Sequence, residues 1–422
     1  MRRVVITGMS AICGNGHTLD EVWKNCIDGK SGISSLTKID ISNFPIQFAG
    51  EVKNFKIAPE LIEEKDHKRY DTFVHYALHS AHLALGDAKL LSENSCNFLK
   101  DLYHPTKVGC ILGVGMGGFP MIEQNHSAFL SGGHRKVSPV FIPAVIPNMA
   151  SGIVTIKYGL RGINYSVSSA CASSAHAILT AANEIRFGNV DCMVTGGAEA
   201  VLTYLPIAGF VNMKALSKRN DAPQKASRPF DIDRDGFVIG EGAAILVLEE
   251  REQAIKRGAH IYAELVGAGA TSDAYHITAP HPEGEGAILC MQQAITSAGI
   301  SPDEIDYINA HGTSTPLGDI AETLAIKKVF GERAIKQEIA VSATKSMIGH
   351  LLGAAGAIES VFCIKALETG IIPPTINLDK QDPECDLYYV PNEAIKRPIR
   401  YALNNSFGFG GTNACLIFKR EG

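Results

Sequence analysis

Two stretches of this chain are so poor in bulky residues that they restrict the folds it can adopt. The first, SSACASSAHAILTAANEI, covers residues 168–185, and the second, SMIGHLLGAAGAIESVFCI, covers residues 346–364. Both carry an apolar stripe at helical spacing, and their small side chains allow neighbouring backbones to approach closely. We expect two helices that lie buried between sheets, one in each half of the chain.

Short apolar runs separate the helical stretches along the whole chain. They are nearly all apolar rather than alternating, as expected for strands that helices cover on both faces. This pattern indicates an α/β fold with layered sheets. The runs occupy residues 2–8, 107–115, 191–200, 243–250, 261–270, 305–312, 338–346 and 413–420.

A weak internal repeat divides the chain into two halves. Each half has one small-residue helix and ends in a hairpin-like pair of apolar strands near a glycine-rich turn, which suggests a duplication. The charged residues 249–260, EEREQAIKRGAH, have the character of a helix and connector between the halves. At 422 residues the chain also exceeds what one hydrophobic core usually serves.

Composition and charge exclude several classes of function. A formal net charge of −5 argues against a nucleic-acid binder. No stretch approaches 18 apolar residues, so we expect no membrane span. The ten cysteines include no C-x-x-C pair, a pattern that suits a reducing cytoplasm better than a disulfide framework. We therefore predict a cytoplasmic protein.

Three motifs resemble ligand sites but lack an essential part. The glycine run GVGMGG at 113–118 is followed by no second strand ending in an acidic residue. The calcium-like loop DIDRDGFVIGEG places Gly242 where a bidentate glutamate is needed. His75, His79 and His82 could share one helix face, but a solvent-facing or interface stripe is favoured over metal ligation. We expect no metal site.

Cys171 stands where an extended segment turns into the first small-residue helix. Free backbone N–H groups and the macrodipole at a helix N-terminus favour a thiolate, so Cys171 is a candidate nucleophile. Most free cysteines are instead buried structural residues. This stretch alone leaves both interpretations open.

The second half offers partners for such a nucleophile. NAHGTSTPLGD places His311 at a strand end within a loop of small, hydroxylated residues. SATKSMIGHLLGAAGA places Lys345 and His350 just before the second small-residue helix. In NNSFGFGGTN, Phe409 lies between glycines and could present its backbone N–H to a developing oxyanion. Two histidines and one cysteine in matching turns favour a catalytic set over satisfied core residues.

These four motifs, in this order, resemble those of the β-ketoacyl-[acyl-carrier-protein] synthases. RPFDIDRDGFVIGEGAAILVLEE resembles the same family, and NCIDGKSGI, GGHRKVSP and TSDAYHITAP look most like its synthase II members. The resemblance covers essentially the whole chain. A Cys-His-His set is similar to that of the elongating synthases I and II, whereas the initiating synthase III has Asn in place of the second histidine.

The resemblance implies a thiolase-like fold: a five-layer αβαβα sandwich built from two duplicated βαβαβαββ halves. Residues 1–252 would carry the nucleophile and residues 253–422 both histidines, normally within a homodimer. The implied activity is that of an acyltransferase: a decarboxylative condensation of acyl and malonyl groups, each carried on acyl carrier protein, which lengthens a fatty chain by two carbons. No cofactor is expected, because phosphopantetheine arrives on the carrier.

The resemblance also implies a role for each site residue. Cys171 would hold the acyl group, His311 and His350 would stabilise the enolate, and Lys345 with Glu359 would support them. The backbone N–H groups of Cys171 and Phe409 would form the oxyanion hole. The remaining expected residues are Thr313 and Thr315 for the phosphopantetheine arm, Gly408 and Gly410 beside the Phe409 gate, and Met116, Phe141 and Phe210 for the acyl tunnel.

The carrier protein is acidic, so its binding needs basic residues at the tunnel mouth. The candidates are Lys65, Lys68, Arg69, Arg135, Lys136 and Lys214, although each taken singly could be an ordinary surface charge.

Two departures from the family pattern leave questions open. The segment 92–107 is longer than usual, and Met116 stands where isoleucine is common in synthase II, which leaves the preferred chain length undetermined. The alternatives are a polyketide ketosynthase, a non-condensing partner subunit and a cysteine hydrolase. Cys171 argues against the non-condensing subunit. Two histidines without an evident Asn or Asp orienter argue against the hydrolase.

Overall fold

The computed structural model describes residues 1–92 and 95–421. Ten strands form one continuous sheet in the order β12-β11-β15-β16-β10-β1-β9-β8-β6-β7. The first half contributes β1 (Val4–Cys13), β6 (Val108–Gly113), β7 (Asn164–Val167), β8 (Cys192–Glu199) and β9 (Gly242–Glu250). The second half contributes β10 (Ala263–Ser272), β11 (Tyr307–Asn309), β12 (Ala340–Ser342), β15 (Tyr401–Gly408) and β16 (Thr412–Arg420).

The strand directions repeat between the halves. From β1, the neighbours β9 and β8 pair antiparallel and then β6 and β7 pair parallel; from β10, the neighbours β16 and β15 pair antiparallel and then β11 and β12 pair parallel. Only Val5↔Glu264 and Ile6↔Ala263 pair β1 with β10. The sheet is therefore two five-stranded sheets joined along a short seam, and the predicted duplication is confirmed.

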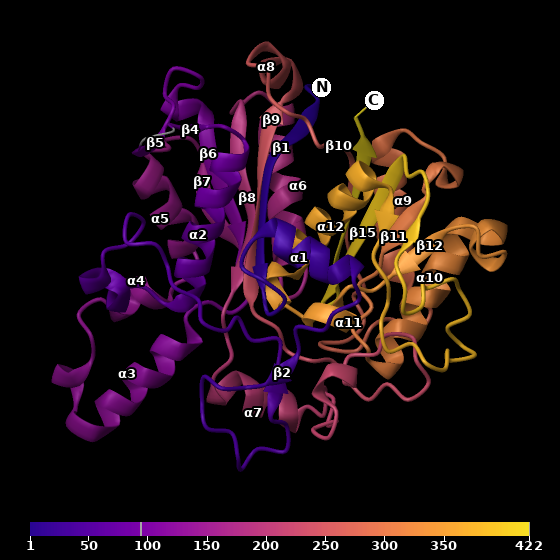
Figure 1. Ribbon diagram of the computed structural model, residues 1–422, viewed down its shortest axis with the longest axis horizontal. Coiled ribbons are helices and arrows are strands. Elements are labelled where there is room, and N and C mark those ends of the chain that lie inside the picture. The colour runs from indigo at the N-terminus through magenta and orange to yellow at the C-terminus, as the bar shows by residue number, and fades with distance from the viewer. Residues whose placement is uncertain (93–94, 422) are drawn as a thin grey trace.

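Helices cover these sheets in three layers (Figure 1). The outer face of the first sheet packs against α2 (Thr72–Asp87) and α5 (Met149–Tyr158). The outer face of the second packs against α9 (Glu285–Ala298) and α10 (Pro316–Ile335). Between the sheets lie α6 (Ser173–Arg186) and α12 (Ala355–Thr369). This is the expected αβαβα sandwich, with both small-residue helices in the middle layer.

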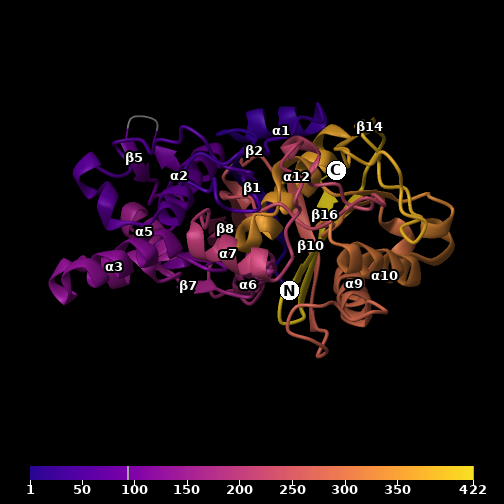
Figure 2. The ribbon, with the colours of Figure 1, turned by 90° about the horizontal axis from the view of Figure 1, so that it is seen from below.

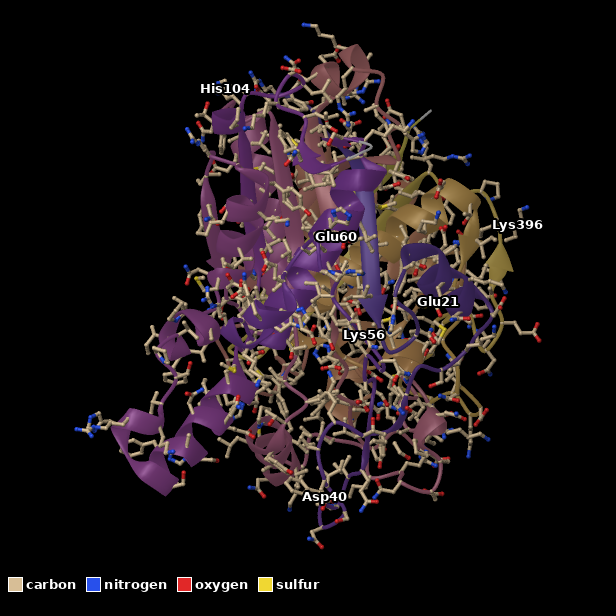
Figure 3. The ribbon with its side chains drawn as sticks, turned by 60° about the vertical axis from the view of Figure 1, so that its left-hand side comes forward. Glu21, Asp40, Lys56, Glu60, His104 and Lys396 are labelled. Carbon is tan, nitrogen blue, oxygen red and sulfur yellow. The ribbon has the colours of Figure 1, made fainter. Side chains whose placement is uncertain are left out.

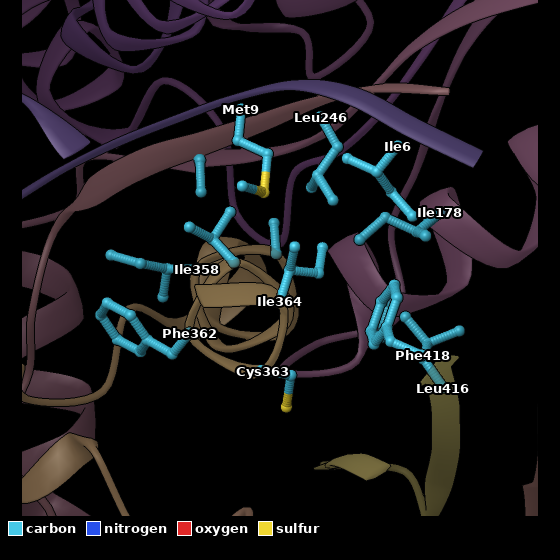
Figure 4. Packing of buried hydrophobic residues seen from close by; sticks show 14 of the residues in the cluster. Ile6, Met9, Ile178, Leu246, Ile358, Phe362, Cys363, Ile364, Leu416 and Phe418 are labelled. Carbon is cyan, nitrogen blue, oxygen red and sulfur yellow. The ribbon is translucent and has the colours of Figure 1, made fainter. Parts of the chain in front are cut away.

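Small side chains allow the middle layer to pack closely. A Cβ on Gly356 of α12 would come within 2.8 Å of the Cβ of Ala175 on α6, and the hydroxyl of Ser174 accepts a hydrogen bond from Ala357 N–H at 2.9 Å. Around α12, bulky side chains from strands and α6 close the core (Figure 4). These include Ile6, Met9, Leu246, Ile178, Leu416 and Phe418. Since apolar side chains occur on all sides of α12, burial between sheets is the environment that suits it.

An arm made of α3 (Phe119–Gly132) and α4 (Phe141–Val145) projects from the first half (Figures 1 and 2). The remaining helices are shorter: α1 (Leu19–Ile27), α7 (Tyr204–Asn212), α8 (Arg251–Lys256) and α11 (Lys345–Ile348). Helix α8 spans both sides of the expected division at 252/253. Charged side chains such as Glu21, Lys56, Glu60 and Lys396 point outward (Figure 3).

The long segment 92–107 contributes to the first core. Its residues 93–94 lie outside the described part of the chain. Strand β5 (Ser95–Phe98) pairs with β4 (Leu91–Ser92), and Phe98 is buried against the first sheet. The Tyr103 hydroxyl donates to the buried carboxylate of Glu249. The segment is thus anchored to strand β9 by a buried polar contact as well as by apolar packing.

Candidate functional site

A cavity of about 730 Å³ lies where loops of both halves meet beyond the ends of the strands. Cys171 reaches it from the first half, and His311 and His350 reach it from the second. The walls also contain Thr313, Thr315, Met116, Phe210, Phe407, Gly408 and Phe409. Most of the residues expected from the sequence to touch substrate therefore share one space, although they are far apart along the chain.

Cys171 occupies a tight turn between β7 and α6. Ala170 has a φ of 49°, a conformation that is costly for a residue with a side chain. The hydroxyl of Ser173 donates to Ala170 O at 2.6 Å and accepts from Ser169 N–H at 2.9 Å. Ser169 in turn contacts His176, whose Nδ1 lies 2.8 Å from the Ser169 hydroxyl. These local bonds hold the strained turn that aims the thiol at the cavity.

The thiol of Cys171 is protonated at neutral pH in the free protein. Burial raises its pKa to about 12, against the opposing effects of the Lys345 charge and of a hydrogen bond from Phe409 N–H. The sequence indicated the helix terminus, which favours a thiolate, but it could not show how deeply the sulfur is buried. Loss of water around the sulfur outweighs the favourable backbone field.

His311 is held by backbone contacts and by Lys345. Its N–H donates to Glu322 Oε1 at 2.8 Å, and its carbonyl oxygen accepts from Lys345 Nζ at 2.7 Å. The Lys345 Nζ also lies 3.4 Å from His311 Nδ1. An ammonium group can only donate, so Nδ1 is the acceptor and the ring hydrogen is on Nε2.

His350 is held by main-chain bonds on both sides. Its N–H donates to Val238 O at 2.7 Å, and its carbonyl accepts from Gly240 N–H at 2.8 Å. The His311 and His350 rings lie edge to face with centroids 5.3 Å apart, and Phe237 packs on the other side of His350 at 5.5 Å. The two rings thus face one region of the cavity from neighbouring loops.

Both histidines are neutral imidazoles at neutral pH. Burial lowers the pKa of each well below 6.5, and the nearby Lys345 charge lowers both further. Each ring can therefore donate one hydrogen bond without carrying a charge.

Lys345 and Glu359 form a buried ion pair behind the histidines. Neither is among the residues that line the cavity. Burial raises the pKa of Glu359 to about 7, while Lys345 opposes that rise. Glu359 thus holds the Lys345 ammonium group beside His311, outside the space where substrate would lie.

The loop around Phe409 contains glycines with positive φ and is hydrogen-bonded to residues 273–277. Gly410 has a φ of 84° and Gly411 a φ of 70°, which glycine adopts at little cost. Gly410 does not line the cavity; its N–H donates instead to Ile277 O at 2.8 Å. Asp273 N–H donates to Gly411 O at 2.7 Å. Two backbone hydrogen bonds thus tie the loop to residues 273–277.

Phe141 is the one tunnel residue that the structure places elsewhere. It begins α4 on the projecting arm and does not line the cavity of its own chain. Met116 and Phe210 do line it. The expected tunnel role of Phe141 therefore stays a prediction, because the arm leads the chain away from its own sandwich after α3.

The six basic candidates differ in their surroundings. Lys214 is exposed and lines the cavity mouth. Lys65 pairs with Glu63 at 2.6 Å and Arg69 with Asp66 at 3.0 Å, so part of their charge is compensated locally. Lys68 is exposed beside them, and Arg135 and Lys136 are exposed at the end of α3.

Sequence analysis missed two buried carboxylates of the site. Glu322 accepts from His311 N–H and Gly312 N–H, both at 2.8 Å. Glu199 accepts from the backbone of two cavity loops. Glu322 follows the NAHGTSTPLGD motif, and Glu199 lies at the end of the predicted strand 191–200. The sequence alone does not show that either carboxylate is buried.

Other sequence-based expectations concern absent features. Among residues 1–92 and 95–421, no helix is long and apolar enough to cross a membrane. Within the same part of the chain, no group of three or more potential ligand side chains could hold a metal ion.

His75 and His79 are half-buried rather than solvent-facing, and burial lowers the pKa of His75 to about 4. The nine cysteines with described side chains are all free and buried.

Comparison with family models matches both halves of the chain. Residues 1–254 match the N-terminal domain of β-ketoacyl synthases, and residues 262–379 match the C-terminal domain. A curated relative from Coxiella burnetii named 3-oxoacyl-[acyl-carrier-protein] synthase 2 is 49% identical over 99% of both chains. A relative of the same name from Vibrio harveyi is 47% identical, again over 99% of both.

Solved structures show the same fold. A β-ketoacyl synthase from Burkholderia phymatum superposes with a TM-score of 0.91 at 36% identity, covering all of both chains. A type II polyketide ketosynthase, solved in complex with its acyl-carrier protein and a bound hexaketide, superposes with a TM-score of 0.91 at 34% identity and the same coverage. The thiolase-like architecture expected from the sequence is therefore confirmed.

Proposed function

The chain belongs to the β-ketoacyl synthase family, and from that premise we propose how its cavity works. The enzyme condenses an acyl group with a malonyl group, both carried on acyl carrier protein, and releases a 3-oxoacyl chain two carbons longer. Full-length relatives at 46–49% identity, all named 3-oxoacyl-[acyl-carrier-protein] synthase 2, favour fatty-chain elongation over the polyketide alternative. The meeting of Cys171, His311 and His350 in one cavity carries the proposal.

Acyl transfer uses the sulfur of Cys171. It attacks the thioester carbonyl of the carrier-bound acyl group, and the oxyanion that forms accepts hydrogen bonds from Cys171 N–H and Phe409 N–H. The Phe409 N–H already lies within reach of the Cys171 sulfur, which supports this placement. When the carbonyl re-forms, the phosphopantetheine sulfur leaves and takes the proton that Cys171 gives up, so the step needs no net proton.

Decarboxylation uses the two neutral histidines. The malonyl thioester oxygen accepts hydrogen bonds from His311 and His350, and the bond to the carboxylate breaks with its electron pair passing to the enolate. Carbon dioxide leaves, and the enolate carbon attacks the acyl thioester on Cys171. The Cys171 sulfur departs as a thiolate and takes a proton from solvent, which balances the charge of the malonyl carboxylate that is lost as carbon dioxide. Both imidazoles are neutral in the buried site, so each can donate a hydrogen bond to the thioester oxygen.

The surrounding residues position the substrate. Thr313 and Thr315, whose hydroxyl oxygens lie 3.0 Å apart, bind the phosphopantetheine arm, and Met116 and Phe210 contact the acyl chain. Lys345, paired with Glu359, orients His311. Phe409 and the glycines beside it open and close between the two half-reactions. The enzyme carries no cofactor of its own, because phosphopantetheine enters on the carrier.

The partners are acyl carrier protein and a second copy of the chain. Lys214 at the cavity mouth supports carrier docking, and the exposed residues Lys65, Lys68, Arg69, Arg135 and Lys136 are the further candidates. The polyketide ketosynthase that shares this fold is itself described in complex with its acyl-carrier protein. Free cysteine thiols are consistent with a cytoplasmic location.

One assay tests the function. The purified enzyme is mixed with acyl carrier and malonyl carrier proteins across a series of acyl lengths, and product masses and carbon dioxide are recorded. Condensation gives a 3-oxoacyl product and carbon dioxide in equal amounts. Release of free acid alone would instead identify a hydrolase, and the length series defines the preferred chain.

A further inference from the structure

Glu199 ends strand β8 with a fully buried carboxylate that binds two separate loops. Its Oε2 accepts from Gly115 N–H at 2.9 Å and from Gly353 N–H at 3.0 Å. Its Oε1 accepts from Met116 N–H at 3.1 Å and from Gly117 N–H at 3.2 Å. These four donors are all backbone groups, and they come from opposite halves of the chain.

The two loops carry residues of different half-reactions. The 115–117 loop presents Met116 to the part of the cavity assigned to the acyl chain. Gly353 follows His350 by three residues, in the turn that leads into α12. The loops approach so closely at Glu199 that neither glycine has room for a side chain. A Cβ on Gly353 would lie 2.2 Å from Gly115 N, and one on Gly115 would lie 2.5 Å from Glu199 Oε2.

Burying a carboxylate away from water costs free energy. Burial raises the pKa of Glu199 to about 7, against the opposing effect of its four hydrogen bonds. A buried carboxylate with backbone donors alone has lost its water and gained no cation, so its net contribution to stability is small. Its four bonds do, however, fix the relative position of the two loops, because each oxygen accepts from more than one donor.

We infer that Glu199 is a positioning residue that ties the acyl-lining loop of Met116 to the loop that carries His350. The inference rests on the proposed function, since it assigns the two loops to the acyl and malonyl sides of one reaction. Substrate is not touched by Glu199. Its effect passes through Met116 on one side and through the backbone next to His350 on the other.

Glu199→Gln tests the inference. The amide keeps the shape of the carboxylate but replaces one acceptor oxygen with an NH₂ donor, which would face backbone N–H groups and release one side of the clamp. A loose Met116 loop should penalise acyl chains long enough to contact it. We expect kcat/KM for dodecanoyl carrier protein to fall at least about tenfold more than kcat/KM for acetyl carrier protein, through KM more than kcat.

Glu249→Gln is the matched control. Glu249 is equally buried and accepts hydrogen bonds from Thr7 and Tyr103, but it also pairs with Arg257 and lies beside Cys192 at the opposite end of β8. Its substitution should lower thermal stability and leave the ratio of dodecanoyl to acetyl kinetics at the wild-type value. Gly353→Ala, which pushes the loops apart without changing charge, should shift that ratio in the same direction as Glu199→Gln.

A second substitution at the same position tests the inference if Glu199→Gln does not fold. Glu199→Asp keeps the charge but shortens the side chain by one methylene, so it cannot reach both loops and should give the same length-dependent loss. If these variants fold and keep the wild-type ratio of dodecanoyl to acetyl kcat/KM, as Glu249→Gln is expected to do, the clamp is overturned. A wild-type enzyme that releases no 3-oxoacyl product would overturn the proposed function instead, and the two failures are therefore distinct.

Discussion

At the scale of single residues, one buried cation acts on all three reactive side chains. The charge of Lys345 lowers the pKa of Cys171 and also lowers the pKa of His311 and His350. The first effect eases thiolate formation, and the second keeps the imidazoles neutral. Because Lys345 has both effects, its removal should impair acyl transfer and decarboxylation together.

Replacing Lys345 with Met should make Cys171 less reactive toward iodoacetamide. The thiol pKa already stands at about 12, and removal of the cation raises it further. Below the pKa, each unit of increase lowers the thiolate fraction about tenfold, so alkylation should slow at every pH below it. Glu359, whose own pKa then rises above about 7, becomes neutral and leaves no unpaired charge. Unchanged alkylation rates in a folded variant would contradict this role.

Cys171→Ala and His311→Ala should separate the two half-reactions. Cys171 carries the one thiol among the described residues that line the cavity, so without it acyl transfer should be lost, while some malonyl decarboxylation remains. Without His311 the acyl group should still reach Cys171, and condensation should stall with little carbon dioxide released. Intact-protein mass spectrometry would show the trapped acyl-enzyme. If His311→Ala instead failed to acylate yet decarboxylated malonyl carrier protein, His311 would be the base for Cys171.

Residue types and motifs were predictable from the sequence, but their environments were not. Cys171, His311 and His350 stand in distinctive turns, so each could be found without a structure. The raised pKa of Cys171 comes from burial by residues of both halves, which no local pattern records. The role of Glu199 depends on Gly353, which is 154 positions away in the sequence. For Phe141 the sequence motif did not show that its arm leaves the sandwich.

At the scale of elements, apolar runs located most strands because helices cover both sheet faces. Strand β15 departs from that rule, since Asn404 and Asn405 are buried within it. The Asn404 amide donates to Gly356 O at 2.9 Å, and the Asn405 amide donates to Glu322 Oε1 at 3.0 Å. The two amide groups thus donate to α12 and α10. The sequence pattern could not show this, because the partners are distant in the chain.

The two halves share a close strand–helix contact that can be tested in parallel. A Cβ on Gly8 of β1 would lie 2.3 Å from Ala84 O on α2, and one on Gly267 of β10 would lie 2.4 Å from Ala294 O on α9. Both glycines follow a bulge in their strand. Gly8→Ala and Gly267→Ala should each lower the free energy of unfolding by about 1–3 kcal/mol, because backbone must shift.

Gly86→Ala is the control for this pair. Gly86 lies exposed in α2, and a Cβ there would meet nothing within 4 Å. The substitution should raise the free energy of unfolding by about 0.5–1 kcal/mol through helix propensity. Urea denaturation measures all three variants. An unaffected Gly267→Ala beside a destabilised Gly8→Ala would show that the repeated contact is not equivalent in the two halves.

At the scale of the whole molecule, charge at the cavity mouth should control carrier binding. Lys214→Glu should raise KM for carrier-bound substrates, while short pantetheine thioesters should react nearly as before. High salt should have the same effect on the wild-type enzyme, because exposed charges are screened. Lys396→Glu, on the exposed strand β14 (Ile395–Lys396), is the control and should change neither. Equal losses with both substrate types would exclude Lys214 from docking.

The arm also bears on assembly, because it leaves large apolar side chains in water. Phe129 is 49% exposed, Leu130 71%, and Ile142 61%. Exposed apolar residues that gather on one projection mark an interaction surface, and most soluble assemblies of identical chains are two-fold dimers. A second copy that covers the arm would bury these side chains. It would also surround Phe141, which has no contact with the cavity of its own chain.

We therefore expect a stable dimer that depends on the arm. Sedimentation at micromolar concentration should give twice the monomer mass, and Ile142→Glu should weaken association because a charge would be buried at the contact. Ile335→Glu is the control: Ile335 is 55% exposed at the end of α10 on the opposite half, and its substitution should leave the dimer intact. If Ile142→Glu sediments as a dimer, the arm is not the contact. A fully active wild-type monomer would show that one chain holds every residue the reaction needs.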